Sequence, residues 1–248
     1  MKNRKLEILN GIPFFSFVPQ RIARAGEFKQ LNGQAKAVED WFLAHHSQAA
    51  PEFERACDGL ESSGIPVVKL QYGELTPRTS LMPAIALVSS SSRLSVKALE
   101  QVHSALVGPE CTGVRSIPVW MGAPHPAKAW YVAPSPSYIP GLLSDLCEFA
   151  TDRRHCALLR ASVTLLQLLL IHPFADGNGR LSRALFLGIA AREITPHPVW
   201  PQALRLLWRH RGTHLHRASL FVRDEDDWSE YVNLFLGAVR EAATPVEK

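Results

Sequence analysis

The sequence has few cysteines and no long apolar run, and both absences exclude classes of protein. Its four cysteines, Cys57, Cys111, Cys147 and Cys156, are scattered without a CxxC spacing, so neither a disulfide framework nor a zinc site is indicated. No segment reaches the roughly 18 apolar residues that a membrane span needs, and the interrupted N-terminus does not resemble a signal peptide. We therefore expect a cytoplasmic protein that contacts no membrane, although a translocated bacterial effector would have the same features.

The charge balance gives little support for nucleic-acid binding. The chain has 27 Lys and Arg against 23 Asp and Glu, a net charge of +4, and these charges are dispersed. The basic stretch WRHRGTHLHR at 208–217 holds His210, His214 and His216, which could bind a metal or a phosphate backbone. Because no acid or cysteine completes a metal set nearby, we interpret this stretch as a solvated basic helix.

Hydrophobic periodicity predicts a mainly α-helical protein. The chain has 248 residues, of which 46% are hydrophobic, enough for a sizeable core. We place a mostly helical N-terminal region at 1–90, a catalytic domain at 91–240 and a tail at 241–248. Helical patterns occur within 20–60, for example at 21–46, and at 93–106, 137–152, 155–171, 181–195, 203–220 and 226–242. The pattern at 155–171 is apolar on nearly every side, which predicts a central helix buried all round.

Extended structure is expected in one place. Residues 113–137 contain the only persuasive extended segments, with β-branched and aromatic residues bounded by Gly and Pro. This composition predicts a short β-hairpin.

A polar motif follows the predicted central helix. The stretch IHPFADGNGR occupies 171–180, and Pro173 should end the helix at His172 because proline cannot continue the hydrogen-bond ladder. Glycines on both sides of Asn178 let main-chain N–H groups turn toward one concavity at the start of the next helix. Such N–H groups form an anion site.

Charged side chains around this turn suit a bound polyphosphate. Arg180 and Arg183 lie three residues apart and share a helix face, and guanidinium groups suit phosphate oxygens. Asp176 would repel an anion unless it holds Mg²⁺ against the phosphates. His172 is the natural general base for a hydroxyl nucleophile. The alternative for each residue alone is a helix end followed by a turn.

No P-loop GxxxxGK[ST] and no GxGxxG fingerprint occurs in the chain. Instead, residues 172–183, HPFADGNGRLSR, closely resemble the Fic family signature HxFx(D/E)GNGRxxR, and every specified position matches. The resemblance extends over about 94–195, because GVRSIPVWMG resembles the family's GxxRxxxVxIG segment, and it continues more weakly to 238.

The resemblance implies an all-helical core with one β-hairpin, the flap, over the active site. It also implies transfer of AMP from ATP to a Ser, Thr or Tyr hydroxyl of a target protein. His172 would deprotonate that hydroxyl, and Asp176 would bind Mg²⁺ between the α- and β-phosphates. Phe174 would anchor the loop in the core.

The remaining roles concern the phosphates and the target. Gly177, Asn178 and Gly179 would line the anion hole, Arg180 would contact the γ-phosphate, and Arg183 would support it. The flap residues Val119, Trp120 and Met121 would register the target by adding its main chain as an extra strand, although an ordinary packed hairpin explains each side chain equally well.

Two departures from common family patterns bear on reaction and regulation. Gly177 and Gly179 stand where phosphocholine-transferring and phosphorylating relatives have alanine and lysine, which favours nucleotidyl transfer. The nearest match to the inhibitory (S/T)xxxE(G/N) helix is 91–96, where Ser95 replaces the glutamate; we favour Ser95 as a helix N-cap. The enzyme would then run unrestrained or be restrained by a partner chain. There are two alternatives. One is a toxin-like enzyme that transfers another nucleotide or a phosphate group, and the other is a catalytically silent interaction module.

Overall fold

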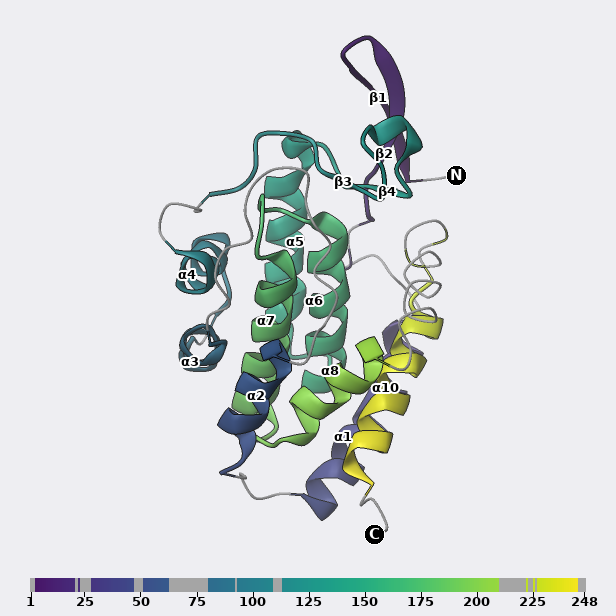
Figure 1. Cartoon of the computed structure of the whole chain (residues 1–248). Helices are drawn as coiled ribbons and strands as arrows, with labels where there is room; N and C mark the ends of the chain where they lie inside the picture. Colours follow the sequence, from purple (N-terminus) through teal and green to yellow (C-terminus); the bar gives the residue numbers. More distant parts are fainter. Residues whose placement is uncertain are drawn as a thin grey trace.

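A computed structural model shows the mainly helical architecture that the periodicity predicts (Figure 1). It describes residues 3–20, 22, 28–46, 51–62, 80–91, 93–108, 113–209, 222, 225 and 227–244. The helices are α1 (Phe28–His45), α2 (Phe53–Ser62), α3 (Met82–Ser90), α4 (Val96–Val107), α5 (Ile139–Thr151), α6 (Ala157–Ile171), α7 (Asn178–Glu193), α8 (Val199–Arg209) and α10 (Ser229–Ala243). The strands are β1 (Arg4–Leu9), β2 (Ile12–Phe17), β3 (Trp120–Met121) and β4 (Tyr131–Val132).

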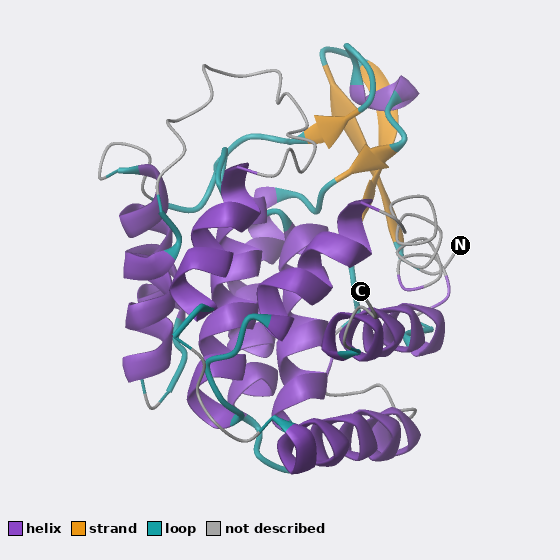
Figure 2. Cartoon of the chain, turned by 60° about the horizontal axis from the view of Figure 1, so that its bottom comes forward, coloured by secondary structure: helices purple, strands orange, loops and turns teal. Residues whose placement is uncertain are grey.

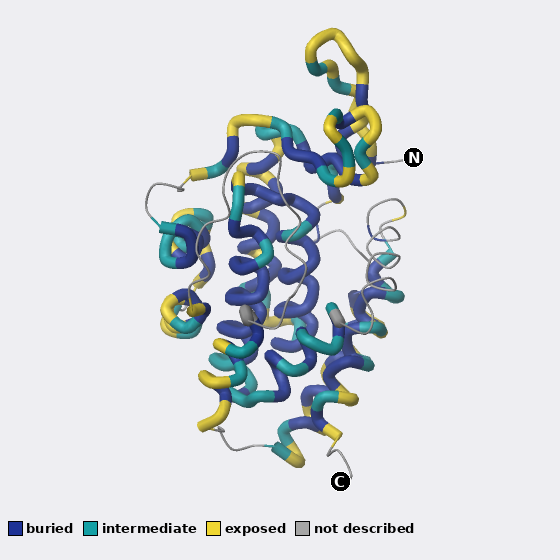
Figure 3. Tube along the Cα trace, in the orientation of Figure 1, coloured by how far each residue is buried: buried dark blue, intermediate teal, exposed yellow. Residues whose placement is uncertain are grey.

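Helix α6 is the centre of the fold, as predicted for 155–171. It packs on α5 and α7, and almost its whole length is buried (Figure 3). A helix that is apolar on every side has to be covered by other helices, because it offers no face to water. Since α6 ends where the polar motif begins, the motif is attached to the buried central helix of the fold.

Helix α3 reaches α7 through a close contact at Gly188. A Cβ atom on Gly188 would lie 2.5 Å from Cβ of Val88, so only glycine lets the two helices approach this closely. Residues before 90 therefore pack directly on residues of the predicted catalytic domain. The division of the chain near residue 90 stays a prediction.

The N-terminal residues form a second hairpin, which the sequence analysis did not predict. β1 and β2 pair antiparallel, with Leu6 opposite Phe15, and the expectation that 113–137 holds the only persuasive extended segments is wrong. Asn10 and Gly11 connect the strands with φ values of 51° and 79°. Two consecutive residues with positive φ are typical of the tight turn that Asn-Gly favours.

Both hairpins gather at one end of the helical bundle (Figure 2). Phe14 of β2, Trp120 of β3 and Val132 of β4 are buried against one another. In the second hairpin, Trp120 pairs with Val132, which confirms the predicted hairpin within 113–137. Its strands are shorter than the extended segments in the sequence.

Several helix ends follow from their capping residues. Ser95 accepts a hydrogen bond from the Ala98 N–H at 3.1 Å, which confirms it as the N-cap of α4. Asp227 accepts from the Ser229 N–H at 2.8 Å, close to the predicted start of the last helix. Pro201 lies in the first turn of α8, where a missing N–H is tolerated.

Of the described thiols, those of Cys57 and Cys147 are buried and that of Cys156 is partly buried. Cys57, Cys147 and Cys156 are free cysteines, and burial raises the pKa of the Cys57 and Cys147 thiols to about 12. Cys111 lies outside the described residues. Within the described ranges, none of the helices is long and apolar enough to cross a membrane.

Candidate active site

His172 ends α6 in a left-handed conformation. Its φ and ψ are 49° and 58°, and its N–H still donates to the Leu168 carbonyl. The following Pro173 cannot continue the helix, so the chain turns away directly after the histidine. This turn places His172 at the end of the buried helix, as the sequence analysis expected.

The imidazole of His172 is buried and neutral. Burial lowers its pKa to about 4, the nearby Arg115 charge lowers it further, and its hydrogen bond to Leu169 and the Asp176 charge oppose these effects. Nδ1 lies 3.3 Å from the Leu169 carbonyl oxygen. Because a carbonyl oxygen only accepts, Nδ1 carries the proton, and Nε2 keeps a free lone pair at neutral pH.

Asn178 closes the loop that follows. Its Oδ1 accepts from the Phe174 N–H at 3.0 Å, and its Nδ2 donates to the Phe174 carbonyl at 2.9 Å. Phe174 itself is completely buried. Both polar atoms of the Asn178 side chain therefore hold the loop by hydrogen bonds to Phe174, and the main chain of Asn178 is the part left for a ligand.

Helix α7 begins earlier than predicted. The sequence predicts a loop through Gly179 and a helix from Leu181, but α7 starts at Asn178 with Gly177 as its N-cap. Gly177 has φ 78°, and a Cβ atom there would lie 2.5 Å from Cγ1 of Val107. A glycine is thus required both by the backbone and by the neighbouring helix, and the first N–H groups of α7 point into the turn.

Asp176 and Arg180 lie next to each other at this helix start. Asp176 Oδ1 accepts from the Gly177 N–H at 2.6 Å, and its Oδ2 lies 3.3 Å from Nη2 of Arg180. Nη1 of Arg180 donates to the Leu106 carbonyl at 3.0 Å. The carboxylate is partly exposed, with 29% of its side chain accessible.

Residues 93–190 match the sequence profile of the Fic/DOC family. The matched range contains α6, the turn and α7 as far as Ala190. The chain contains a Fic/DOC domain.

Relatives of this Fic domain include two proteins named protein adenylyltransferase fic-1, from Caenorhabditis briggsae and Caenorhabditis elegans. Each is 27% identical over 163 residues, which is 60% of this chain and 30% of the relative. The match thus spans less than a third of those proteins.

Solved structures share the fold. A Fic family protein from Desulfovibrio desulfuricans G20 superposes with a TM-score of 0.60 at 19% identity, covering 90% of this chain and 74% of that one. Residues 134–508 of Fic-1 from C. elegans give 0.53 at 19% identity, with 86% and 70% covered. The likeness shows the same helical architecture.

Two further residues of the motif lie on the first turns of α7 in the Fic domain. Arg183 is buried, with 7% of its surface exposed. A Cβ atom on Gly179 would lie 3.2 Å from Nη1 of Arg183, so this guanidinium lies over the glycine at the helix start. Gly179 therefore leaves room for Arg183 beside the N–H groups of α7.

His103 of α4 is a residue of the site that sequence reasoning missed. Its ring stacks on Phe174, with centroids 3.8 Å apart and planes at 9°, and its Nε2 lies 2.8 Å from the Asp176 carbonyl oxygen. Desolvation lowers the pKa of His103. A histidine inside an amphipathic helix gives no sequence signal for this role, because its partners Phe174 and Asp176 lie in the turn between α6 and α7.

The flap of the Fic domain rests on the end of α6. Val119 and Trp120 are buried, whereas Met121 is partly exposed. The Val119 carbonyl accepts from the Ala133 N–H at 3.0 Å, and the Tyr131 hydroxyl donates to the Leu170 carbonyl of α6. The side chains of Val119 and Trp120 thus hold the hairpin against the rest of the protein.

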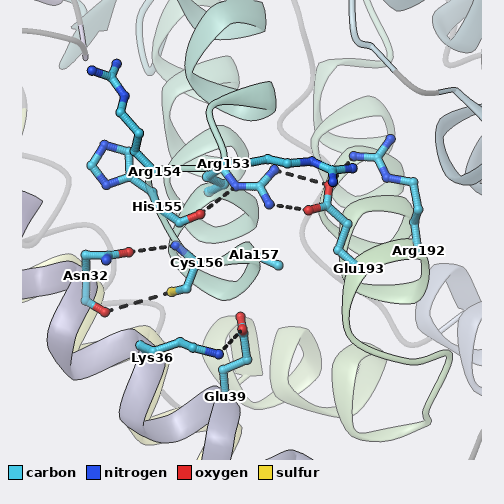
Figure 4. Close-up of a pocket in the computed structure, with 11 residues that line it drawn as sticks. Asn32, Lys36, Glu39, Arg153, Arg154, His155, Cys156, Ala157, Arg192 and Glu193 are labelled. Carbon is cyan, nitrogen blue, oxygen red and sulfur yellow. Dashed lines mark hydrogen bonds and ion pairs between the residues drawn. The ribbon is translucent and has the colours of Figure 1, made fainter.

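Figure 4 shows a separate hollow of about 590 Å³. Its lining includes Ala157 at the start of α6 and Glu193 at the end of α7, so it occupies the opposite end of both helices. There, Arg160 forms an ion pair with Glu193, and Arg192 pairs with the same carboxylate. The pair of Arg160 with Glu193 joins α6 to α7, which explains the polar lining structurally.

The basic histidine stretch at 210–217 lies outside the described residues. In the described part of the chain, no group of three His, Cys, Asp or Glu side chains is placed to hold a metal. Asp176 alone is nonetheless compatible with Mg²⁺, because this ion is commonly held by one or two carboxylates together with substrate phosphates.

Proposed function

We propose that the protein is an adenylyltransferase, which transfers AMP from ATP to a Ser, Thr or Tyr hydroxyl of a target protein. The observation that carries the proposal is the placement of a neutral histidine beside the N-terminus of α7. Nε2 of His172 keeps its lone pair, and Asp176 and Arg180 flank the same turn. The resemblance to proteins named adenylyltransferases supports the nature of the transferred group.

The proposed chemistry starts with proton transfer to His172. Nε2 accepts the proton of the target hydroxyl while its oxygen attacks the α-phosphorus of ATP. An oxygen–phosphorus bond forms to the target, the bond between the α-phosphorus and the bridging oxygen breaks, and pyrophosphate leaves. A pKa of about 4 keeps the base unprotonated at neutral pH, and the rigid helix end fixes its position.

The start of α7 would bind the phosphates. Gly177, Asn178 and Gly179 would line the anion hole. The Gly177 N–H donates to Asp176, so the N–H groups of Asn178 and Gly179, with the positive end of the helix dipole, would favour the anion there. Arg180 would contact the γ-phosphate and Arg183 would support it, which agrees with their positions on the first two turns of α7. Asp176 would hold Mg²⁺, which neutralises phosphate charge when bound.

The flap would bind the target protein. Because the side chains of Val119 and Trp120 are buried, we assign the recognition of the target to the flap's main chain, through strand addition, and to Met121. Residues 1–90 are the candidate for further contacts with the target.

Regulation would not use an inhibitory glutamate from the chain itself. Ser95 stands at the expected position and caps α4, so this segment is a helix start. The enzyme would run unrestrained or be restrained by a partner chain. We further propose a cytoplasmic location.

Labelled ATP tests the proposal. We expect label from α-³²P-ATP to appear on protein, and none from γ-³²P-ATP. The variant His172→Ala should lose the transfer, whereas His155→Ala, before the opposite end of α6, should retain it. Transfer of the γ-label would show a kinase, and no transfer with any nucleotide would favour a silent interaction module.

A further inference from the structure

The left-handed conformation of His172 needs support from other parts of the protein. This conformation is strained for a residue with a side chain, relative to the right-handed region. His172 has φ 49°, and Pro173 follows it. Such a conformation persists only where surrounding contacts hold it.

Arg115 supplies those contacts from outside the motif. Its Nε donates to the His172 carbonyl at 2.7 Å, and its Nη2 lies 3.5 Å from the Ile171 carbonyl. Carbonyl groups at the end of a helix have no partner within the helix. A positive charge at this end also complements the helix dipole.

The same side chain fixes both stems of the flap. Nη1 of Arg115 donates to the Ile117 carbonyl at 2.8 Å, and Nη2 donates to the Pro134 carbonyl at 2.6 Å. Its main-chain N–H donates to the Pro173 carbonyl at 2.9 Å. Arg115 is 5% exposed, so water does not compete for these contacts.

We propose that Arg115 is a positioning residue, whose buried guanidinium holds the main-chain turn that presents His172 and fixes the flap to that turn. The kinetic consequence of this role rests on the proposed transfer reaction, whereas the hydrogen bonds of Arg115 do not depend on that reaction. Lysine has one nitrogen and cannot reproduce the planar fork that reaches the His172, Ile117 and Pro134 carbonyls together.

Arg115 also affects the base electrostatically. The charged groups that act on His172 are Arg115, which lowers its pKa, and Asp176, which raises it. Removal of the Arg115 charge, together with easier access of water, should therefore raise the pKa of His172 above about 4.

The test compares Arg115→Gln and Arg115→Lys with the control Arg160→Gln. Arg160 is a buried arginine at the other end of α6, where it donates to the Ala150 carbonyl at 2.8 Å and pairs with Glu193. The Arg160→Gln variant therefore shows the effect of losing a buried guanidinium that does not contact the candidate site. All variants of the full chain are measured at a temperature at which circular dichroism shows them folded.

The readouts are kcat and KM for ATP in AMP transfer, and the pH profile of kcat. We expect Arg115→Gln to lower kcat about 10- to 100-fold, as a displaced base does, with KM for ATP changed less than about threefold. The acid limb of the profile should move to higher pH, and Arg115→Lys should fall between this variant and wild type. Equal effects of Arg115→Gln and Arg160→Gln on kcat and pH profile would overturn the proposal.

A second readout separates this inference from the proposed function. If the wild-type protein transfers nothing, the proposed function fails, but the pKa of His172 can still be followed by NMR in histidine-labelled, nucleotide-free protein. The His172 signal is assigned with His172→Gln. We expect a higher pKa in Arg115→Gln than in wild type and in Arg160→Gln, and an unchanged pKa would contradict the role of Arg115.

Discussion

Gly177→Ala should destabilise the protein strongly, although it adds a single methyl group. Gly177 has φ 78°, and its Cβ would lie 2.5 Å from Cγ1 of Val107 and 3.0 Å from Nε2 of His103. The left-handed conformation costs a side chain about 1 kcal/mol, and overpacking typically adds about 1–3 kcal/mol. We therefore expect the free energy of unfolding to fall by about 2–4 kcal/mol.

Urea unfolding followed by circular dichroism measures this change. Gly33→Ala is the matched control, because Gly33 lies within α1 and a Cβ there has no atom within 4 Å. That substitution should stabilise the protein by about 0.5–1 kcal/mol. In the double variant with Val107→Ala, part of the Gly177→Ala loss should disappear through coupling of the two sites. A Gly177→Ala protein as stable as wild type would refute the reasoning.

The other predictions concern pH and helix capping. The folded-state pKa of His172, about 4, lies below the unfolded value near 6.5, so the unfolded chain binds more protons and stability falls as pH drops from 6.5 to 4. The loss from His172 should amount to about 3 kcal/mol; urea unfolding at several pH values measures it, and stability that stays constant in this window would exclude a buried neutral His172. Ser95→Ala should cost about 1 kcal/mol and leave the transfer rate of folded enzyme unchanged; a changed rate at unchanged stability would contradict the capping role of Ser95 in α4.

Sequence patterns predicted the elements whose signals are local. The apolar run before Pro173 predicted α6 and its end at His172, and Ser95 was recognised as a cap because Ser in this position bonds its own helix. The hairpin at Arg4–Phe17 was not predicted although Asn10–Gly11 is a strong turn signal, because its second strand contains Pro13, and a proline within a run counts against a strand.

The contacts that shape the candidate site could not be predicted from local signals. His103 lies on α4 and Arg115 before the flap, and both act on the turn after α6 through tertiary contacts. The start of α7 at Asn178 was also missed, since Gly177 and Gly179 suggested a loop, whereas Gly177 is the left-handed cap of the helix. The motif thus indicated the candidate reactive groups, and the fold shows what holds them.

Intact mass spectrometry of the protein after incubation with ATP and Mg²⁺ tests the central claim most directly. We expect self-modification of the wild-type chain to add the mass of one or more AMP groups, with pyrophosphate released, and His172→Ala to keep its unmodified mass while remaining folded. An AMP adduct of equal yield on His172→Ala, or an adduct with the mass of a phosphate group on the wild type, would contradict the account.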